Sequence, residues 1–105
     1  MKQFTTPEQT AKLIELGYEK PIPKYNNGWL LIESANYSIG ELIEMLPENV
    51  AKENEMPSTL NISLMNGEWC VQYADFLGTD FEFCNTELID ALFDMAVKLR
   101  EKGVI

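Results

Sequence analysis

Apolar and polar residues alternate on both sides of Asn66-Gly67, within the stretch Thr59–Asp75. Such alternation indicates a β-hairpin, and Asn-Gly suits a two-residue type I′ turn because both turn positions require positive φ. The turn fixes the register, which brings the large apolar residues to one face and the small or polar residues to the other. The apolar pairs are Leu64 with Trp69, Ile62 with Val71 and Leu60 with Tyr73; the other pairs are Ser63 with Cys70, Asn61 with Gln72 and Thr59 with Ala74. We expect the six apolar residues to share a buried face.

Three segments carry the signals of α-helices. The first begins at Thr6, where Thr6-Pro7-Glu8-Gln9 forms a capping box, and ends at Gly17. The second begins with the capping box from Ser38 to Glu41 and ends before Pro47. The third follows a cap at Asn85 or Thr86 and ends at Gly103. The expected core stripes are Ile39, Leu42, Ile43 and Leu46 in the second helix, and Leu88, Leu92, Met95 and Leu99, widened by Ile89 and Ala96, in the third.

The remaining segments complete an α+β fold. The prolines and Asn-Asn-Gly of residues 19–28 predict a loop, and the apolar run Trp29–Ile32 favours a buried strand. Residues 48–58 are polar and predict a connecting loop; residues 76–80 predict a turn before a strand at residues 81–84, whose Phe81 and Phe83 join the apolar face. We expect a single globular domain spanning residues 1–105, with an antiparallel meander of three strands, or four with Trp29–Ile32, and about three helices packed on one face.

Charge narrows the classes of partner. The chain of 105 residues has 8 basic and 17 acidic residues, a net charge of −9, and no Lys or Arg lies between Lys52 and Lys98. Such a surface repels phosphates, which disfavours direct nucleic-acid binding and allows a partner with a basic surface. No apolar run has the roughly 18 residues of a membrane span, and the first residues lack the apolar region of a secretory signal, so we expect a cytoplasmic protein.

Chemistry-bearing motifs are sparse. The sequence has no histidine and no nucleotide-binding, serine-hydrolase or metalloprotease motif, so we expect no enzymatic activity, no cofactor and no metal. Asp80 and Glu82 could in principle bind a divalent cation or act as acid and base, but solvated surface charge is the simpler interpretation. Cys70 and Cys84 form no CxxC motif, and we expect reduced, packed thiols, with a disulfide between adjacent strands as the alternative.

Two surfaces are candidates for binding. At helical spacing, Glu87, Asp90 and Asp94 form an acidic stripe beside Phe93 and Val97, which suits docking onto a basic protein patch. The simpler interpretation is a solvated helix exterior, and a third option is a homodimer formed through Phe93 and Val97. The alternative surface is the polar sheet face, where Asn61, Ser63 and Gln72 could hydrogen-bond a small molecule or nucleotide, or form only the wet side of the sheet.

Three motifs carry a family resemblance: YSIGELIEMLP, NGEWCVQY and the closing LIDALFDMAVKLREKGVI. Over roughly residues 37–105 the chain resembles small uncharacterised proteins encoded by phages and mobile elements of gut bacteria, which share an SxGxLxEMLP-like helix and a W-C-x-x-Y-like strand. The resemblance implies an accessory gene and supplies no activity, cofactor or site. We therefore expect a non-enzymatic acidic accessory protein that blocks a basic surface of a host protein, with a small-molecule or nucleotide binder as the alternative.

Overall fold

A computed structural model describes residues 1–21, 25–26, 29–30, 36–50 and 57–105. It confirms the predicted α+β class, with an antiparallel four-stranded meander in the order β3-β4-β5-β6. The strands of this sheet are β3 (Asn49–Val50), β4 (Ser58–Met65), β5 (Glu68–Asp75) and β6 (Gly78–Asn85). The helices are α1 (Pro7–Glu15), α2 (Ile39–Met45) and α3 (Leu88–Glu101), and a separate two-stranded ribbon joins β1 (Tyr25–Asn26) to β2 (Trp29–Leu30).

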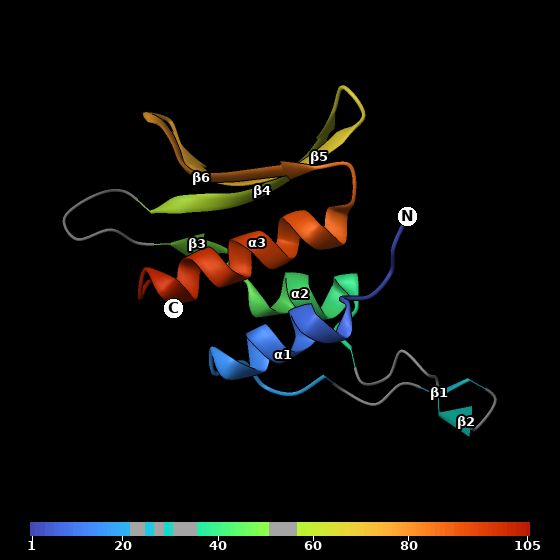
Figure 1. Ribbon diagram of the computed structural model, residues 1–105. Helices are drawn as coiled ribbons and strands as arrows, with labels where there is room; N and C mark the ends of the chain where they lie inside the picture. The colour runs from blue at the N-terminus through green and yellow to red at the C-terminus, as the bar shows by residue number, and fades with distance from the viewer. Residues whose placement is uncertain (22–24, 27–28, 31–35, 51–56) are drawn as a thin grey trace.

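The β4–β5 hairpin has the predicted register. All six predicted pairs are present, and the turn residues Asn66 and Gly67 have φ of 52° and 79°. On the apolar face, Val71 and Tyr73 are fully buried. Leu64 is on the predicted face, but its burial was wrongly predicted, since it is 58% exposed. It lies next to the turn, where the hairpin bends away from the helices (Figure 1).

Strand β6 continues the same alternation. Val71 pairs with Phe83 and Tyr73 with Phe81, and both phenylalanines pack against the core, as predicted. The register shifts between Tyr73 and Ala74, so the strand pair is irregular near the β5–β6 turn. In that turn the Asp75 carboxylate accepts hydrogen bonds from the backbone N–H groups of the second and third residues after it, which is an Asx turn.

Helix α3 lies against one face of the sheet, and α1 and α2 lie on the opposite side of α3 (Figure 1). Because it has neighbours on two sides, α3 needs a wide apolar stripe. Its buried residues are Leu88, Ile89, Ala91, Leu92, Met95, Ala96 and Leu99, which confirms the predicted stripe and adds Ala91. The core therefore has α3 at its centre, between the sheet and the other two helices.

The predicted helix ends are confirmed for α1 and α2. Thr6 and Ser38 both form complete capping boxes, and α2 ends at Met45 with Leu46 as its C-cap, directly before Pro47. Gly17 has φ of +95° and follows the C-cap of α1, as predicted. The predicted cap of α3 was wrong, because the N-cap is Glu87, without a side-chain capping bond.

The N-terminal segment, residues 1–5, binds the starts of α2 and α3. The backbone N–H of Thr5 donates to the Tyr37 carbonyl over 2.9 Å, and the Ile39 N–H donates to the carbonyl of Gln3 over 3.2 Å. The backbone N–H of Lys2 donates to the Glu87 carboxylate over 2.8 Å. All three helices therefore begin near this segment and run in the same direction (Figure 1).

Three predictions about shorter elements need correction. The fourth strand of the meander is β3, within the segment predicted as a loop, whereas β2 pairs with β1 outside the meander, and β1 itself lies in the predicted loop 19–28. The last two residues of the predicted strand Trp29–Ile32 lie outside the described residues. On α2, Ile43 was predicted in the buried stripe but is 37% exposed, while Met45 packs against the core.

Candidate functional site

The acidic stripe of α3 is partly occupied by the N-terminal segment. Besides the contact of Lys2 with Glu87, the Lys2 ammonium forms an ion pair with Asp90 at 3.0 Å. The Gln9 side-chain amide donates to the same Asp90 oxygen over 2.9 Å. Two of the three carboxylates of the stripe thus bind residues of this chain. The sequence could not show these contacts, because they join residues more than 80 positions apart.

The other stripe residues are half-buried. Phe93 and Val97 pack against the core and do not form an exposed apolar patch. Asp94 lies between the interior and solvent, where burial, and then the nearby Asp90 carboxylate, raises the pKa of its carboxyl group. Four of the five predicted residues therefore lie on α3, and Glu87 is its N-cap, but little apolar area is available there for a partner or a second copy.

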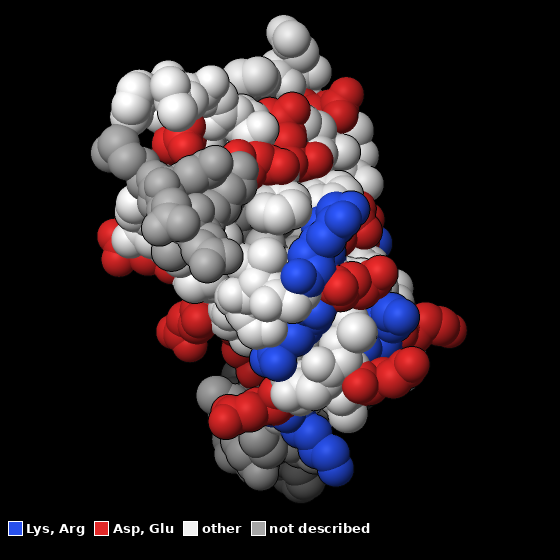
Figure 2. Space-filling view, turned by 90° about the vertical axis from the view of Figure 1, so that its left-hand side faces the viewer, with Lys and Arg blue, Asp and Glu red and all other residues white. Residues whose placement is uncertain are grey.

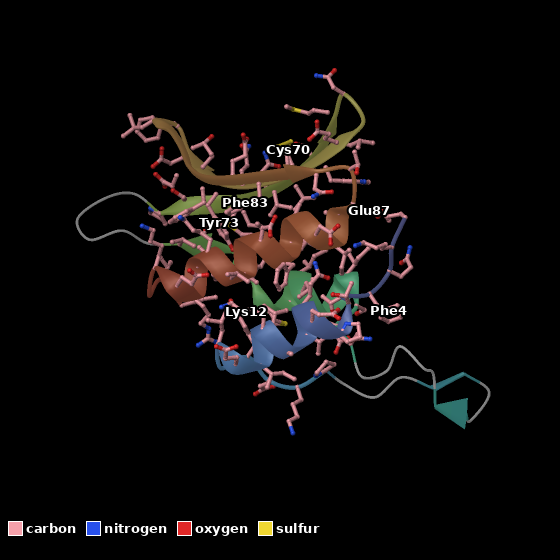
Figure 3. All side chains as sticks on the ribbon, in the orientation of Figure 1. Phe4, Lys12, Cys70, Tyr73, Phe83 and Glu87 are labelled. Carbon is pink, nitrogen blue, oxygen red and sulfur yellow. A yellow bond between two sulfur atoms is a disulfide. The ribbon has the colours of Figure 1, made fainter. Side chains whose placement is uncertain are left out.

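The polar face of the sheet lies on the side away from the helices. Figure 3 shows Cys70 on this side and Tyr73 and Phe83 on the opposite side. Asn61 pairs with Gln72, and Gln72 pairs in turn with Glu82, so three polar side chains form a row across β4, β5 and β6. Ser63, beside Cys70, belongs to the next row. The structure thus brings the predicted ligand-binding residues together on a surface that none of the described helices covers.

The two cysteines form a disulfide. Cys70 and Cys84 are directly paired on β5 and β6, with a Cα–Cα distance of 4.1 Å. The prediction of reduced thiols was therefore wrong, and the alternative of a disulfide between adjacent strands is correct. The signal for it was the alternation of both strands, which places both cysteines on the polar face. Neither sulfur is a free nucleophile in this state.

Charge is divided between the layers of the molecule. Strands β4, β5 and β6 contain Glu68, Asp75, Asp80 and Glu82 and no Lys or Arg. Figure 2 shows this division: the upper part, formed by the sheet, has acidic and uncharged residues, and basic residues begin at the level of α3. Glu68 and Glu82 are exposed on the polar face. This layer therefore repels anions and attracts cationic groups.

Exposed apolar residues lie at both turns of the sheet. Leu64 and Met65, before the β4–β5 turn, are 58% and 56% exposed, and Phe76 and Leu77, in the β5–β6 turn, are 76% and 82% exposed. The two turns lie at opposite ends of β5, so the polar face is flanked by an apolar group at each end (Figure 1). The sequence assigned Phe76 and Leu77 to a turn but gave them no role.

A cleft of about 650 Å³ lies elsewhere, at the C-terminal ends of the three helices. Its lining residues include Tyr18, Tyr37, Glu41, Glu44, Met45 and Arg100, and Asn61 and Gln72 are not among them. The Arg100 guanidinium stacks on the Tyr18 ring at 4.3 Å, and its Nε atom is buried without a hydrogen-bond partner. The Tyr18 hydroxyl donates to the Ala96 carbonyl over 2.8 Å. Sequence reasoning missed this cleft, because its lining comes from helix ends far apart in the chain.

Burial makes the tyrosine hydroxyls of the interior weaker acids than an exposed tyrosine. Burial raises the pKa of Tyr73, with a smaller contribution from Tyr18, and the Tyr73 hydroxyl donates to the Pro47 carbonyl over 2.7 Å. Burial also raises the pKa of Tyr18 and of Tyr37, and Tyr37 donates to the carbonyl of Glu19. These phenols are protonated near neutral pH, so they bind backbone oxygens and do not act as bases.

The described part of the chain lacks two further kinds of feature. No group of three or more acidic or cysteine side chains is arranged to hold a metal ion there. None of the described helices combines the length and the apolar character required to cross a bilayer.

Comparisons with protein-family models, curated proteins and solved structures gave no match to this chain. The resemblance to phage and mobile-element proteins stays a prediction from the motifs, and any functional conclusion rests on the surfaces described above.

Proposed function

We propose that this protein is a non-enzymatic acidic accessory factor that binds and blocks a basic surface of another protein. The observation that carries the proposal is the face of the β4–β5–β6 sheet that the described helices leave uncovered. This layer has no Lys or Arg, has exposed carboxylates at Glu68 and Glu82, and has exposed apolar residues at both turns. Carboxylates attract a basic patch over a distance, and apolar groups at the rim add contact area once the partner has arrived.

A basic protein surface fits this layer better than a nucleic acid does. Nucleic-acid binding requires Lys and Arg that replace the counterions of phosphates, and the sheet layer has neither. A patch that binds phosphates is itself basic, so an acidic sheet can occupy it in place of a nucleic acid. The proposed host protein is therefore one with a nucleic-acid-binding surface, and the phage-like motifs of residues 37–105 agree with an accessory role.

The sheet supports this proposal better than the α3 stripe does. Glu87 and Asp90 already bind the N-terminal segment, and Phe93 and Val97 pack against the core. A cytoplasmic location is part of the proposal. This location requires that the Cys70–Cys84 disulfide persists in a reducing compartment or is dispensable there, because disulfides are rare in such compartments.

The experiment compares two double charge reversals in binding to a partner captured from the native host. Glu68→Lys with Glu82→Lys changes the polar face, and Glu15→Lys with Glu101→Lys makes the same change of net charge on exposed helix positions. We expect the sheet variant to bind at least about tenfold more weakly and the helix variant to stay within about threefold of the unchanged protein. Affinity should fall as ionic strength rises, and binding that is indifferent to salt would contradict the proposal.

A small-molecule binder is the second candidate function, and the cleft favours it. The cleft has aromatic walls, carboxylates from α2 and the unpartnered Nε of Arg100, which resembles an ordinary ligand site more closely than the flat polar face does. A metabolite and nucleotide panel in a thermal-shift assay tests this candidate, because a ligand of the folded state raises the melting temperature. Arg100→Lys, which retains the charge and loses Nε–H, should reduce such a shift.

A further inference from the structure

Strand β6 is the last strand at one side of the described sheet. It follows β5 at the end of the order β3-β4-β5-β6, and no described segment pairs with its outer side. The strand has eight residues, Gly78–Asn85, whereas the strand at the opposite edge, β3, has two. An edge strand of this length can present backbone N–H and C=O groups that another extended chain can bind.

The pairing shows which backbone groups of β6 point outward. Directly opposed residues of antiparallel strands alternate between hydrogen-bonded pairs, about 5.5 Å apart at Cα, and non-bonded pairs, about 4.5 Å apart. The Cα atoms of Cys70 and Cys84 are 4.1 Å apart, so the backbones of these two residues form a pair without hydrogen bonds between them. The N–H and C=O of Cys84 thus point away from β5. Glu82, two residues earlier and opposite Gln72, has the same orientation.

The β4–β5 hairpin gives the same alternation independently. A two-residue turn is closed by a hydrogen-bonded pair, here Met65 with Glu68, so the bonded pairs that follow include Ser63 with Cys70 and Asn61 with Gln72. The backbone groups of Cys70 and Gln72 are therefore used by β4 and cannot bind β6. The Leu60 N–H, on the non-bonded side of this pattern, donates outward to the Glu48 carbonyl over 2.9 Å, as the alternation requires.

We propose that a basic, extended segment of the partner pairs with the outer edge of β6 and adds a fifth strand to the sheet. This inference rests on the proposed function and names the surface that carries it. The segment accepts from and donates to the outward groups of Glu82 and Cys84. Its side chains alternate between a polar side, next to the exposed Glu82 carboxylate, and a side next to the half-buried Phe81 and Phe83. A segment that alternates Lys or Arg with apolar residues meets both requirements.

The charge of the edge discriminates against a second copy of this chain. In an antiparallel β6–β6 pair, the Glu82 carboxylates of both copies would lie on the same face of the joined sheet, in protomers that each have a net charge of −9. Like charges opposed across strands are destabilising. An acidic residue on an edge rejects other acidic edges and accepts a basic one, so the same side chain supplies protection from self-association and selectivity for the partner.

The experiment follows amide hydrogen exchange in the full chain as a short peptide of alternating valine and lysine is added. We expect the outward amides of Glu82 and Cys84 to exchange at least about tenfold more slowly with the peptide, while those of Phe81 and Phe83, already bonded to β5, change less. A peptide with glutamate in place of lysine should give no protection. Glu82→Pro removes an outward N–H and should weaken peptide binding about tenfold, whereas Glu82→Gln retains the N–H and should weaken it less.

The outcomes separate this inference from the proposed function. If the lysine peptide binds in a salt-dependent way but protects amides outside β6, the inference about the β6 edge is wrong and the proposed function is still supported. Absence of salt-dependent binding to lysine-rich peptides and to basic proteins would overturn both. Protection of Glu82 and Cys84 that depends on protein concentration without peptide would show a second copy at the edge and overturn the inference. If Glu82→Pro does not fold, amide hydrogen exchange of the unchanged protein with and without the peptide remains the test of the inference.

Discussion

The two faces of the β4–β5–β6 sheet differ in what covers them. On one face Val71 and Tyr73 are fully buried under α3. On the other face the neighbouring positions of the same strand, Cys70 and Gln72, lie on the side that the helices leave uncovered (Figure 3). One strand thus supplies the core and the proposed binding surface in alternate residues. The period of the strand places the core side chains and the proposed binding residues on opposite faces, so a surface residue such as Gln72 can change without loss of core packing.

The largest difference between the faces should appear in a pair of alanine substitutions. Leu92→Ala, in the part of α3 that is fully buried, removes apolar contacts and leaves a cavity, so we expect a loss of about 2–5 kcal/mol in the free energy of unfolding. Gln72→Ala, on the uncovered face, should change it by less than about 0.5 kcal/mol. Urea unfolding of both variants measures the two values. Equal losses would show that the uncovered face is packed like the core.

Removal of the disulfide tests whether the face turned away from the helices stabilises the fold through a covalent link. Cys70→Ser together with Cys84→Ser removes a link between residues 14 positions apart, and a closed loop of this size predicts a loss of about 2–4 kcal/mol. The expected loss of stability comes from the greater conformational freedom of the unfolded chain without the link. The substitutions themselves remove little apolar area. Reduction of the unchanged protein should give a similar loss, and the double variant should be insensitive to a reductant.

The smallest effect concerns the outward side of α3. The raised pKa of Asp94 means that the folded state binds its proton more tightly than the unfolded state, so stability falls as pH rises from the ordinary aspartate pKa through the raised one. Asp94→Asn should therefore raise the melting temperature slightly at neutral pH and reduce its pH dependence. Asp90→Asn is the matched control and should lower the melting temperature, because Asp90 accepts hydrogen bonds from Lys2 and Gln9.

The hairpin and the caps of α1 and α2 could be predicted because their signals are local. Asn66-Gly67 requires positive φ at both residues, which sets the turn and with it every pair of β4 and β5. The capping boxes at Thr6 and Ser38 each lie within four residues. The stripe of α3 repeats over 14 residues, long enough to identify a core helix.

The errors have a common physical cause, which is dependence on distant partners. A two-residue strand such as Asn49–Val50 has no periodicity, and only its pairing with Ser58 and Thr59 defines it. Nothing in the apolar run from Trp29 indicates that this segment pairs with β1 and does not join the meander. At the candidate surfaces, the sequence showed which side chains share a face, but it could not show that Lys2 and Gln9 bind the acidic stripe.

The contacts of the N-terminal segment constrain the order in which the chain can fold. A ribosome produces Lys2 and Thr5 long before it produces Glu87 and Asp90, to which Lys2 binds. Lys2 therefore lacks its final partners until most of the polypeptide has been synthesised, whereas Gln3 and Thr5 bind Ile39 and Tyr37, which are made much earlier.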